Sequence, residues 1–274
     1  MNVLHDTRKI QILQGLVEGN SIRSLERMTG THRDTICRLL RSAGERCEAL
    51  LDEKVRNVRA HDVECDEVWC YVCKKDRRLT PEDGPEVGSQ YIFVGMESHS
   101  KLVISHMVGK RDSETAHQFM EDLASRLRNK VQLTTDGFRA YEDAVEAAFG
   151  LDVHYAMLDK IYHSNGGPKR EGYIPSEIVD LRPISLIGDP DPTRISTSYI
   201  ERQNLTMRMQ MRRLTRLTNA FSKKLENLKA ALALHFAWYN FGRVHRTLRV
   251  TPGMEAGLTD RVWGMEEIFF MERK

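Results

Sequence analysis

The first 55 residues carry apolar side chains at helical spacing. From Ile10, apolar positions recur every three or four residues until Gly19-Asn20 interrupts the run. Ser21 is a candidate N-cap for a second short helix, and Thr31-His32-Arg33-Asp34 has the form of a capping box that begins a third. Three short helices with a glycine-bearing turn before the third are typical of a helix-turn-helix, although a plain three-helix bundle has the same pattern.

Beyond residue 60 the pattern changes to runs of β-forming residues separated by amphipathic segments. We expect strands over 63–73, 91–96, 102–108, 131–135 and 153–157, with helices over 112–129 and 138–149. The order predicts a mixed α/β sheet, in which a three-stranded antiparallel meander leads into a parallel part. Two further helices are expected over 198–218 and 222–239.

These patterns suggest a division of the chain into parts. Residues 1–46 are interpreted as a helix-turn-helix DNA-binding domain and residues 47–60 as a connecting helix or linker. Residues 61–218 are interpreted as an α/β catalytic core, and residues 219–274 as a C-terminal basic helical segment. Within the core, residues 158–197 hold five of the eight prolines and are expected to form an irregular insertion.

Composition then excludes several classes of protein. Of the 274 residues, 41% are hydrophobic and 29% are charged, as in globular proteins with a core. No apolar run approaches the roughly 18 residues that a membrane span needs, and the first residues lack the pattern of a secretory signal. The five cysteines are unevenly spaced, which suits a reducing compartment. We therefore expect a cytoplasmic protein without membrane contact.

The distribution of charge is more informative than the total. The net charge is +2, but residues 198–249 contain 11 Lys or Arg and only 2 Asp or Glu. A basic stripe of this length suggests binding to a polyanion, most simply nucleic acid. A solvated helix face would give the same excess of basic residues.

Three carboxylates lie at the ends of predicted elements. Asp66 is on the first strand, Asp136 ends the fourth, and Glu201 is in the first turn of the helix after the insertion. If the first and fourth strands are neighbours, both aspartates point to one place, and a helix crossing that edge adds the glutamate. Converging carboxylates repel one another unless a cation such as Mg²⁺ or Mn²⁺ neutralises them. A pair of such ions about 3.5–4 Å apart suits phosphoryl transfer.

Other acids compete for this role. Glu67 adjoins Asp66 and, by strand alternation, is expected on the opposite face, which makes it the rival ligand. Asp112, Asp152 and Asp159 are further rivals.

Three motifs together resemble the DDE transposases of the IS1 family. They are Cys65-Asp66-Glu67-Val68-Trp69, Thr134-Thr135-Asp136-Gly137 and Tyr199-Ile200-Glu201-Arg202-Gln203-Asn204-Leu205. The similarity covers nearly all of residues 60–250. It implies a ribonuclease-H-like mixed sheet flanked by helices, and it makes Asp66, Asp136 and Glu201 catalytic ligands of two Mg²⁺ ions, with Mn²⁺ as a substitute.

The chain departs from that family in two respects. Gln203 stands where many members have histidine, and no array of paired cysteines precedes residue 37. Cys70-x-x-Cys73 is a single pair, and its sulfurs would point to opposite faces of a strand, so we do not expect a zinc site there.

The resemblance implies a prokaryotic, nucleoid-associated transposase. Such an enzyme binds the terminal inverted repeats of an insertion sequence, nicks the ends by Mg²⁺-dependent hydrolysis and joins the 3′-hydroxyls to target DNA, as a homodimer or larger assembly. Two alternatives are a nuclease of the same fold without strand transfer and a DNA-binding regulator that has lost catalysis. Contacts with double-stranded DNA are expected from His32, Arg33, Thr35, Arg38, Arg41, Arg202, Asn204, Arg208, Arg212, Arg213 and Arg216.

Overall fold

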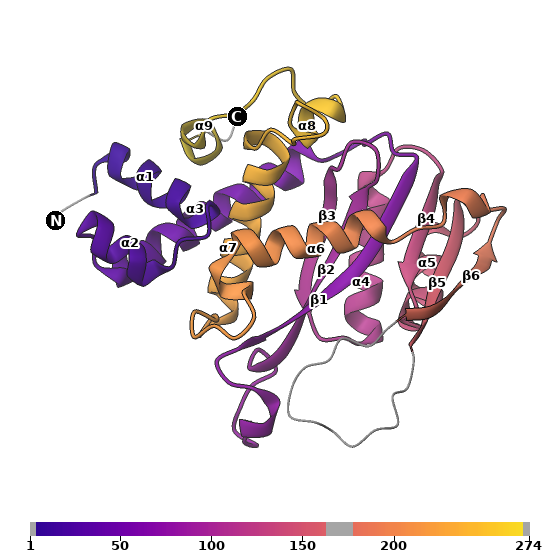
Figure 1. Ribbon diagram of the computed structural model, residues 1–274, viewed down its shortest axis with the longest axis horizontal. Helices are drawn as coiled ribbons and strands as arrows, with labels where there is room; N and C mark the ends of the chain where they lie inside the picture. Colours follow the sequence, from indigo (N-terminus) through magenta and orange to yellow (C-terminus); the bar gives the residue numbers. More distant parts are fainter. Residues whose placement is uncertain (1–3, 163–177, 271–274) are drawn as a thin grey trace.

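The computed structural model describes residues 4–162 and 178–270, and a six-stranded sheet lies at its centre (Figure 1). The strand order is β3-β2-β1-β4-β5-β6. Strands β1, β2 and β3 are antiparallel neighbours, β4 and β5 run parallel to β1, and β6 runs antiparallel to β5. This confirms the mixed α/β, ribonuclease-H-like sheet that the sequence predicts. The strands are β1 Asp62–Val72, β2 Gly88–Glu97, β3 Val103–Gly109, β4 Val131–Asp136, β5 Val153–Tyr162 and β6 Ile178–Ile187.

Helices cover both faces of this sheet. Helices α4 (Ser113–Arg126) and α5 (Ala140–Phe149) pack together on one face. Between them and the sheet lie the rings of Phe93, Phe119 and Tyr141, all fully buried. Helix α6 (Ser198–Gln210) crosses the opposite face in front of β1 (Figure 1). None of the helices in the described ranges is long and apolar enough to cross a membrane.

The remaining helices form a separate layer beside the sheet. They are α1 (Asp6–Val17), α2 (Ile22–Thr29), α3 (Arg33–Lys54), α7 (Leu225–Ala237), α8 (Pro252–Glu255) and α9 (Met265–Phe270). Helix α3 packs along α7, and α9 packs against α1 and α3 (Figure 1). The contact between α3 and α7 is close because of Gly44, where an added Cβ would lie 2.3 Å from the Cα of Ala230.

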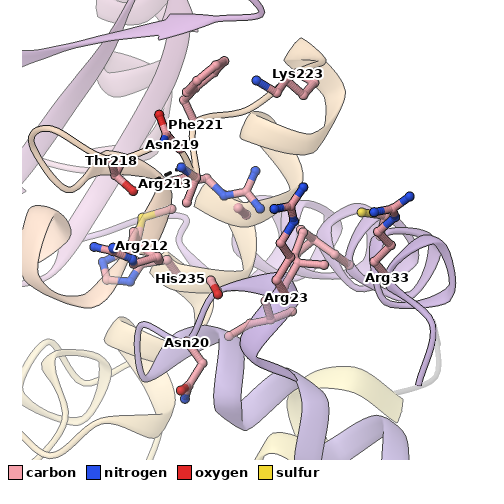
Figure 2. Close-up of a pocket in the computed structure, with 18 of the residues that line it drawn as sticks. Asn20, Arg23, Arg33, Arg212, Arg213, Thr218, Asn219, Phe221, Lys223 and His235 are labelled. Carbon is pink, nitrogen blue, oxygen red and sulfur yellow. Dashed lines mark hydrogen bonds between the residues drawn. The ribbon is translucent and has the colours of Figure 1, made fainter. Parts of the chain in front are cut away.

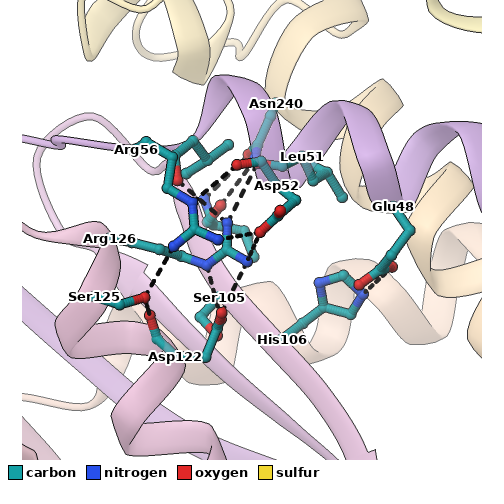
Figure 3. A network of polar contacts seen from close by, with 12 residues as sticks. Glu48, Leu51, Asp52, Arg56, Ser105, His106, Asp122, Ser125, Arg126 and Asn240 are labelled. Carbon is teal, nitrogen blue, oxygen red and sulfur yellow. Dashed lines mark hydrogen bonds and ion pairs between the residues drawn. The ribbon is translucent and has the colours of Figure 1, made fainter. Parts of the chain in front are cut away.

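Arg126 fastens the last turn of α3 to α4 (Figure 3). Its guanidinium donates to the backbone carbonyl of Val55, which lies beyond the last helical N–H, and to that of Leu51, which also accepts from the N–H of Val55. It also pairs with the carboxylates of Asp52 on α3 and Asp122 on α4. Since Arg126 is only 8% exposed, these four partners compensate for the burial of its charge.

The start and the length of α3 differ from the prediction. The N-cap is His32, whose Nδ1 accepts from the backbone N–H of Asp34, and Thr31 is buried, so the expected capping box is wrong. Helix α3 also runs without interruption through residues 46 and 47, so the third helix and the expected connecting helix are one element. The division into domains and the helix-turn-helix role of α1–α3 stay predictions.

The expected irregular insertion and the following helices also differ from the prediction. Strand β5 continues to Tyr162 and pairs with β6, so much of residues 158–197 is regular, while residues 163–177 lie outside the described chain. Pro183 is compatible with a strand here because β6 is at the edge of the sheet. On the open side of an edge strand, no neighbouring strand needs the N–H that proline lacks. Helix α6 ends at Gln210 instead of residue 218, and α7 begins at Leu225.

We expect Arg126→Ala to lower the free energy of unfolding by about 3–5 kcal/mol, because it leaves two helix carbonyls and two carboxylates without their buried partner. Urea unfolding followed by circular dichroism measures this loss. Arg128→Ala is the matched control, since Arg128 is exposed and follows α4 by two residues. A loss at Arg126 no larger than that at Arg128 would contradict the anchoring role.

Candidate active site

The register of the sheet brings Asp66 and Asp136 together. Parallel pairing of β1 with β4 ends where Cys65 faces Thr135, so the two aspartates are the next residue on each strand. The carboxylate oxygens of Asp66, Glu67 and Asp136 include a set that lies within 4.8 Å of one another. The sequence predicted the convergence of the two aspartates but not the presence of Glu67.

Glu67 approaches Asp136 from the other side of the sheet. Side chains alternate along β1, so that of Glu67 points away from that of Asp66. Strand β4 ends at Asp136, however, which leaves room at the strand end for the side chain of Glu67 to reach Asp136. Its side chain is 2% exposed, and Oε2 lies 3.3 Å from Nε of Arg111. Oε1 forms no well-aligned hydrogen bond among the described residues, although the buried hydroxyl of Tyr141 is close enough to lower the pKa of Glu67. The site therefore contains a buried carboxylate oxygen that is available to a cation.

Glu64 fixes the position of α6 on this edge of the sheet. Its Oε2 accepts from the backbone N–H groups of Tyr199 and Ile200, at 2.8 and 2.9 Å. These N–H groups belong to the first turn of α6, where they lack partners within the helix and where the helix dipole favours a negative charge. Glu64 is 3% exposed, and burial raises the pKa of its carboxyl group. The sequence analysis missed Glu64, although an acid two residues before Asp66 shares its face of the strand.

Asn204 lies one turn after Glu201 and contacts Asp66 directly. Its Nδ2 donates to Oδ2 of Asp66 at 2.7 Å, and the backbone N–H of Glu67 donates to Oδ1. The Oδ1 atom of Asn204 is buried without a partner among the described residues. We expected Asn204 to contact DNA, but here it orients the carboxylate of Asp66.

Glu201 lies beside the aspartates and not within their group. Its Oε1 accepts from Nζ of Lys160 on β5 and from Oγ1 of Thr197. The charge of Glu201 raises the pKa of both Asp66 and Asp136, while that of Lys160 lowers them. Lys160 was missed by the sequence analysis, because it lies within the segment interpreted as an irregular insertion.

Burial and mutual repulsion make these acids hold their protons. Burial, followed by the charge of Asp136, raises the pKa of Asp66 to about 6 and that of Glu67 to about 7. Burial likewise raises the pKa of Asp136, although Arg111 and Lys160 lower it. Oxygen-only donors and the unpartnered buried oxygens of Glu67 and Asn204 fit a hard divalent cation such as Mg²⁺ or Mn²⁺.

The remaining rival acids lie outside this group. Asp112 accepts from the backbone N–H of Thr115 and so begins α4. Asp152 is exposed before the first residue of β5. Asp159 is on β5 and is exposed. Its carboxylate lies next to Gly137, the residue after Asp136.

Two arginines among the expected DNA contacts form contacts within the protein, as Asn204 and His32 do. Nη1 of Arg41 pairs with Glu226 at 2.6 Å. Nη1 of Arg213 donates to Oγ of Ser222 and to the backbone carbonyl of Asn227, and burial lowers the pKa of Arg213 to about 10. The side chains of the remaining residues are exposed or half-buried, and their contact with DNA stays a prediction: His32, Arg33, Thr35, Arg38, Arg202, Arg208, Arg212 and Arg216.

No protein-family model matches the chain, and no curated protein matches its sequence. Similar solved structures include a Mos1 transposase paired-end complex with the left transposon end, at 14% identity and a TM-score of 0.23, covering 57% of this chain and 60% of that one. The Mos1 strand transfer complex is 16% identical with a TM-score of 0.24, covering 57% and 59%.

A piggyBac transposase synaptic complex with hairpin DNA is 11% identical with a TM-score of 0.40, and the match covers 99% of this chain and 73% of that one. The chain thus spans about three fifths of the length of the Mos1 chains that it matches. Similarity at this level leaves the function to be inferred from the geometry of the carboxylates.

We expect Glu64→Ala to lower the free energy of unfolding by about 1–3 kcal/mol, because it leaves two buried N–H groups of α6 without an acceptor. Glu64→Gln should restore most of this loss, since an amide oxygen can accept from the same groups. Urea unfolding of both variants measures the difference, with Glu121→Ala on the exposed face of α4 as the control. Equal losses for alanine and glutamine would contradict the capping role.

The raised pKa values also predict a pH dependence in the absence of divalent ions. The folded carboxyls of Asp66 and Glu67 keep protons that the unfolded chain has released, so the free energy of unfolding should fall as the pH rises from about 4 to about 7. Adding Mg²⁺ at pH 7 should restore stability, because a cation compensates the ionised acids.

Thermal unfolding in a chelator and in Mg²⁺ measures both effects. Asp66→Asn should reduce both, whereas Asp143→Asn, on the exposed side of α5, should change neither. Stabilisation by Mg²⁺ that is the same in Asp66→Asn as in the wild type would place the ion elsewhere.

Proposed function

We propose that the protein is a DNA transposase whose phosphoryl-transfer site consists of Asp66, Asp136 and Glu201. The observation that supports this best is the convergence of two strand-end aspartates at one edge of the sheet, with Glu201 held beside them by α6. The three motifs that resemble the IS1-family transposases are the segments that carry these acids.

The same residues are the proposed ligands of two Mg²⁺ ions, for which Mn²⁺ can substitute. When bound, such ions activate the attacking oxygen and stabilise the leaving oxygen of a phosphodiester. Asn204 holds the carboxylate of Asp66 in one orientation, and Lys160 keeps Glu201 close to the aspartates. Arg111, which lies near Asp136 and over the ring of Phe138, keeps a positive charge at the rim where a phosphate would approach.

In the proposed reaction, water attacks a phosphorus atom at the element end, and the bond from phosphorus to the 3′-oxygen breaks. The 3′-hydroxyl that is released then attacks a phosphodiester of the target DNA and displaces a second 3′-oxygen. The basic stripe over residues 198–249 supports DNA as the substrate, because it continues from the helix that carries Glu201.

The proposal assigns a role to each part of the chain. Helices α1–α3, within residues 1–46 for most of their length, would recognise the terminal inverted repeats as a helix-turn-helix. Residues 61–218 would carry out catalysis, and residues 219–274 would add basic surface. Two DNA ends must be brought together, so we propose a homodimer or larger assembly, acting at the nucleoid of a prokaryotic cell.

We expect Asp136→Asn to reduce Mg²⁺-dependent cleavage of an element end by about 100-fold or more, the scale on which loss of one charge-stabilising group acts. DNA binding should be unchanged. Labelled duplexes that contain the sequence flanking the gene provide the cleavage assay, and Asp143→Asn is the matched control.

Wild-type activity in Asp136→Asn would refute the site. A joining assay with unlabelled target DNA separates the remaining functions. Strand-transfer product supports a transposase, cleavage without joining indicates a nuclease, and binding without cleavage by the wild type indicates a regulator.

A further inference from the structure

A cavity of about 970 Å³ opens between the N-terminal helices and the segment that follows α6 (Figure 2). Residues of α1, α2 and α3 line one wall, residues 211–223 line the other, and α7 contributes Ala231, Leu234 and His235. The cavity is strongly basic, because Asp34 is the one acid among the described residues that line it. Its basic side chains are Arg23, Arg33, Arg78, Arg212, Arg213 and Lys223.

Several of the charges on the two walls have no carboxylate partner among the described residues. Arginines elsewhere are held by carboxylates, as Arg126 and Arg56 are by Asp52. By contrast, in the described ranges no carboxylate forms an ion pair with Arg23, Arg33 or Arg212. Like charges that face one another across a cavity raise the free energy of the folded protein. A bound anion would relieve this repulsion.

The floor of the cavity presents a second, independent feature. His235 is 2% exposed, and neither of its ring nitrogens has a partner among the described residues. Burial, followed by the charge of Arg243, lowers the pKa of His235 to about 3, so its ring is neutral and carries one N–H. A buried donor without an acceptor costs free energy, which an oxygen atom of a ligand would recover.

Helix α6 relates this cavity to the carboxylates. Glu201 lies in its first turn, and Gln210 ends it nine residues later, just before the segment that lines the cavity. At 1.5 Å per residue, this separation is roughly 14 Å along the helix axis, or about four steps of a DNA strand. A single duplex can therefore reach both places.

We propose that this basic cavity is a second DNA-binding site, which holds the phosphodiester backbone of the duplex whose end lies at the carboxylates. The proposal rests on the proposed function, since it takes DNA as the polyanion. Contacts of guanidinium groups with phosphates fix position without reading bases, so the cavity sets how far the duplex extends past the site of cleavage. Arg23, on α2, and Arg212, after α6, contact phosphates of the DNA backbone from opposite walls of the cavity.

The first test is the salt dependence of binding to a labelled duplex, measured by fluorescence anisotropy with the full chain. Arg23→Gln/Arg212→Gln should weaken binding by about tenfold and reduce the slope of log K against log salt by roughly 2, one unit for each phosphate contact. Arg128→Gln, at an exposed position after α4 and outside the cavity, should bind like the wild type. Unchanged affinity and slope in the double variant would overturn the proposal.

The second test locates the DNA through Cys37, a half-buried free thiol that lines the cavity. In a Cys73→Ser background the other cysteines are buried, so alkylation reports on Cys37. Duplex DNA should protect this thiol from iodoacetamide, and it should protect the Asp136→Asn variant equally. Full reactivity of Cys37 at saturating DNA would overturn the proposal.

Inorganic phosphate and a mononucleotide, added at the same phosphate concentration, should give no protection. Protection by either one that equals that of the duplex would assign the cavity to a small phosphate ligand and overturn the DNA assignment. Neither readout requires cleavage. Protection of Cys37 without cleavage would thus refute the proposed catalytic function alone, and cleavage without protection would refute the second site alone.

Discussion

The contact between Glu64 and the first turn of α6 is the interaction on which the arrangement of the acids depends. A strand and a helix more than 130 residues apart in the chain are joined by two hydrogen bonds to one buried carboxylate. These bonds fix both the rotation and the axial position of α6. With α6 in that position, Asn204 contacts Asp66 and Glu201 lies beside the aspartates. Strand pairing alone would not place these two residues of α6.

This arrangement is costly in free energy. Asp66, Glu67 and Asp136 are partly or largely removed from water and repel one another. Among the described residues, the charges of Lys160 and Arg111 oppose this repulsion. A chain selected for stability alone would place amides or apolar groups at this strand edge. The residues are consistent instead with a site that is stabilised when a divalent ion arrives.

Local signals in the sequence predicted most of the helices and strands. They also predicted two of the three acids whose oxygens converge, Asp66 and Asp136, but not Glu67. Period-two and period-3.6 patterns depend on neighbouring residues, so the strands up to β5 and the positions of most helices could be predicted. The convergence of Asp66 and Asp136 follows from the pairing of adjacent parallel strands. Glu64, Lys160 and the internal contacts of Arg213 were not predicted, because each depends on a partner that lies elsewhere in the fold. Strand β6 was missed because Pro183 within it and the other prolines of residues 158–197 indicate a loop, unless the strand is known to lie at an edge.

The continuity of α3 has a mechanical consequence. One end of the helix carries residues of the basic cavity, its middle touches α7 backbone to backbone at Gly44, and its last turn is fastened by Arg126. A hinge needs residues whose dihedral angles can change without loss of contacts, and no part of this helix offers them. The N-terminal helices are therefore held at a fixed position relative to the sheet, so a partner that contacts both has to match the spacing that the protein sets.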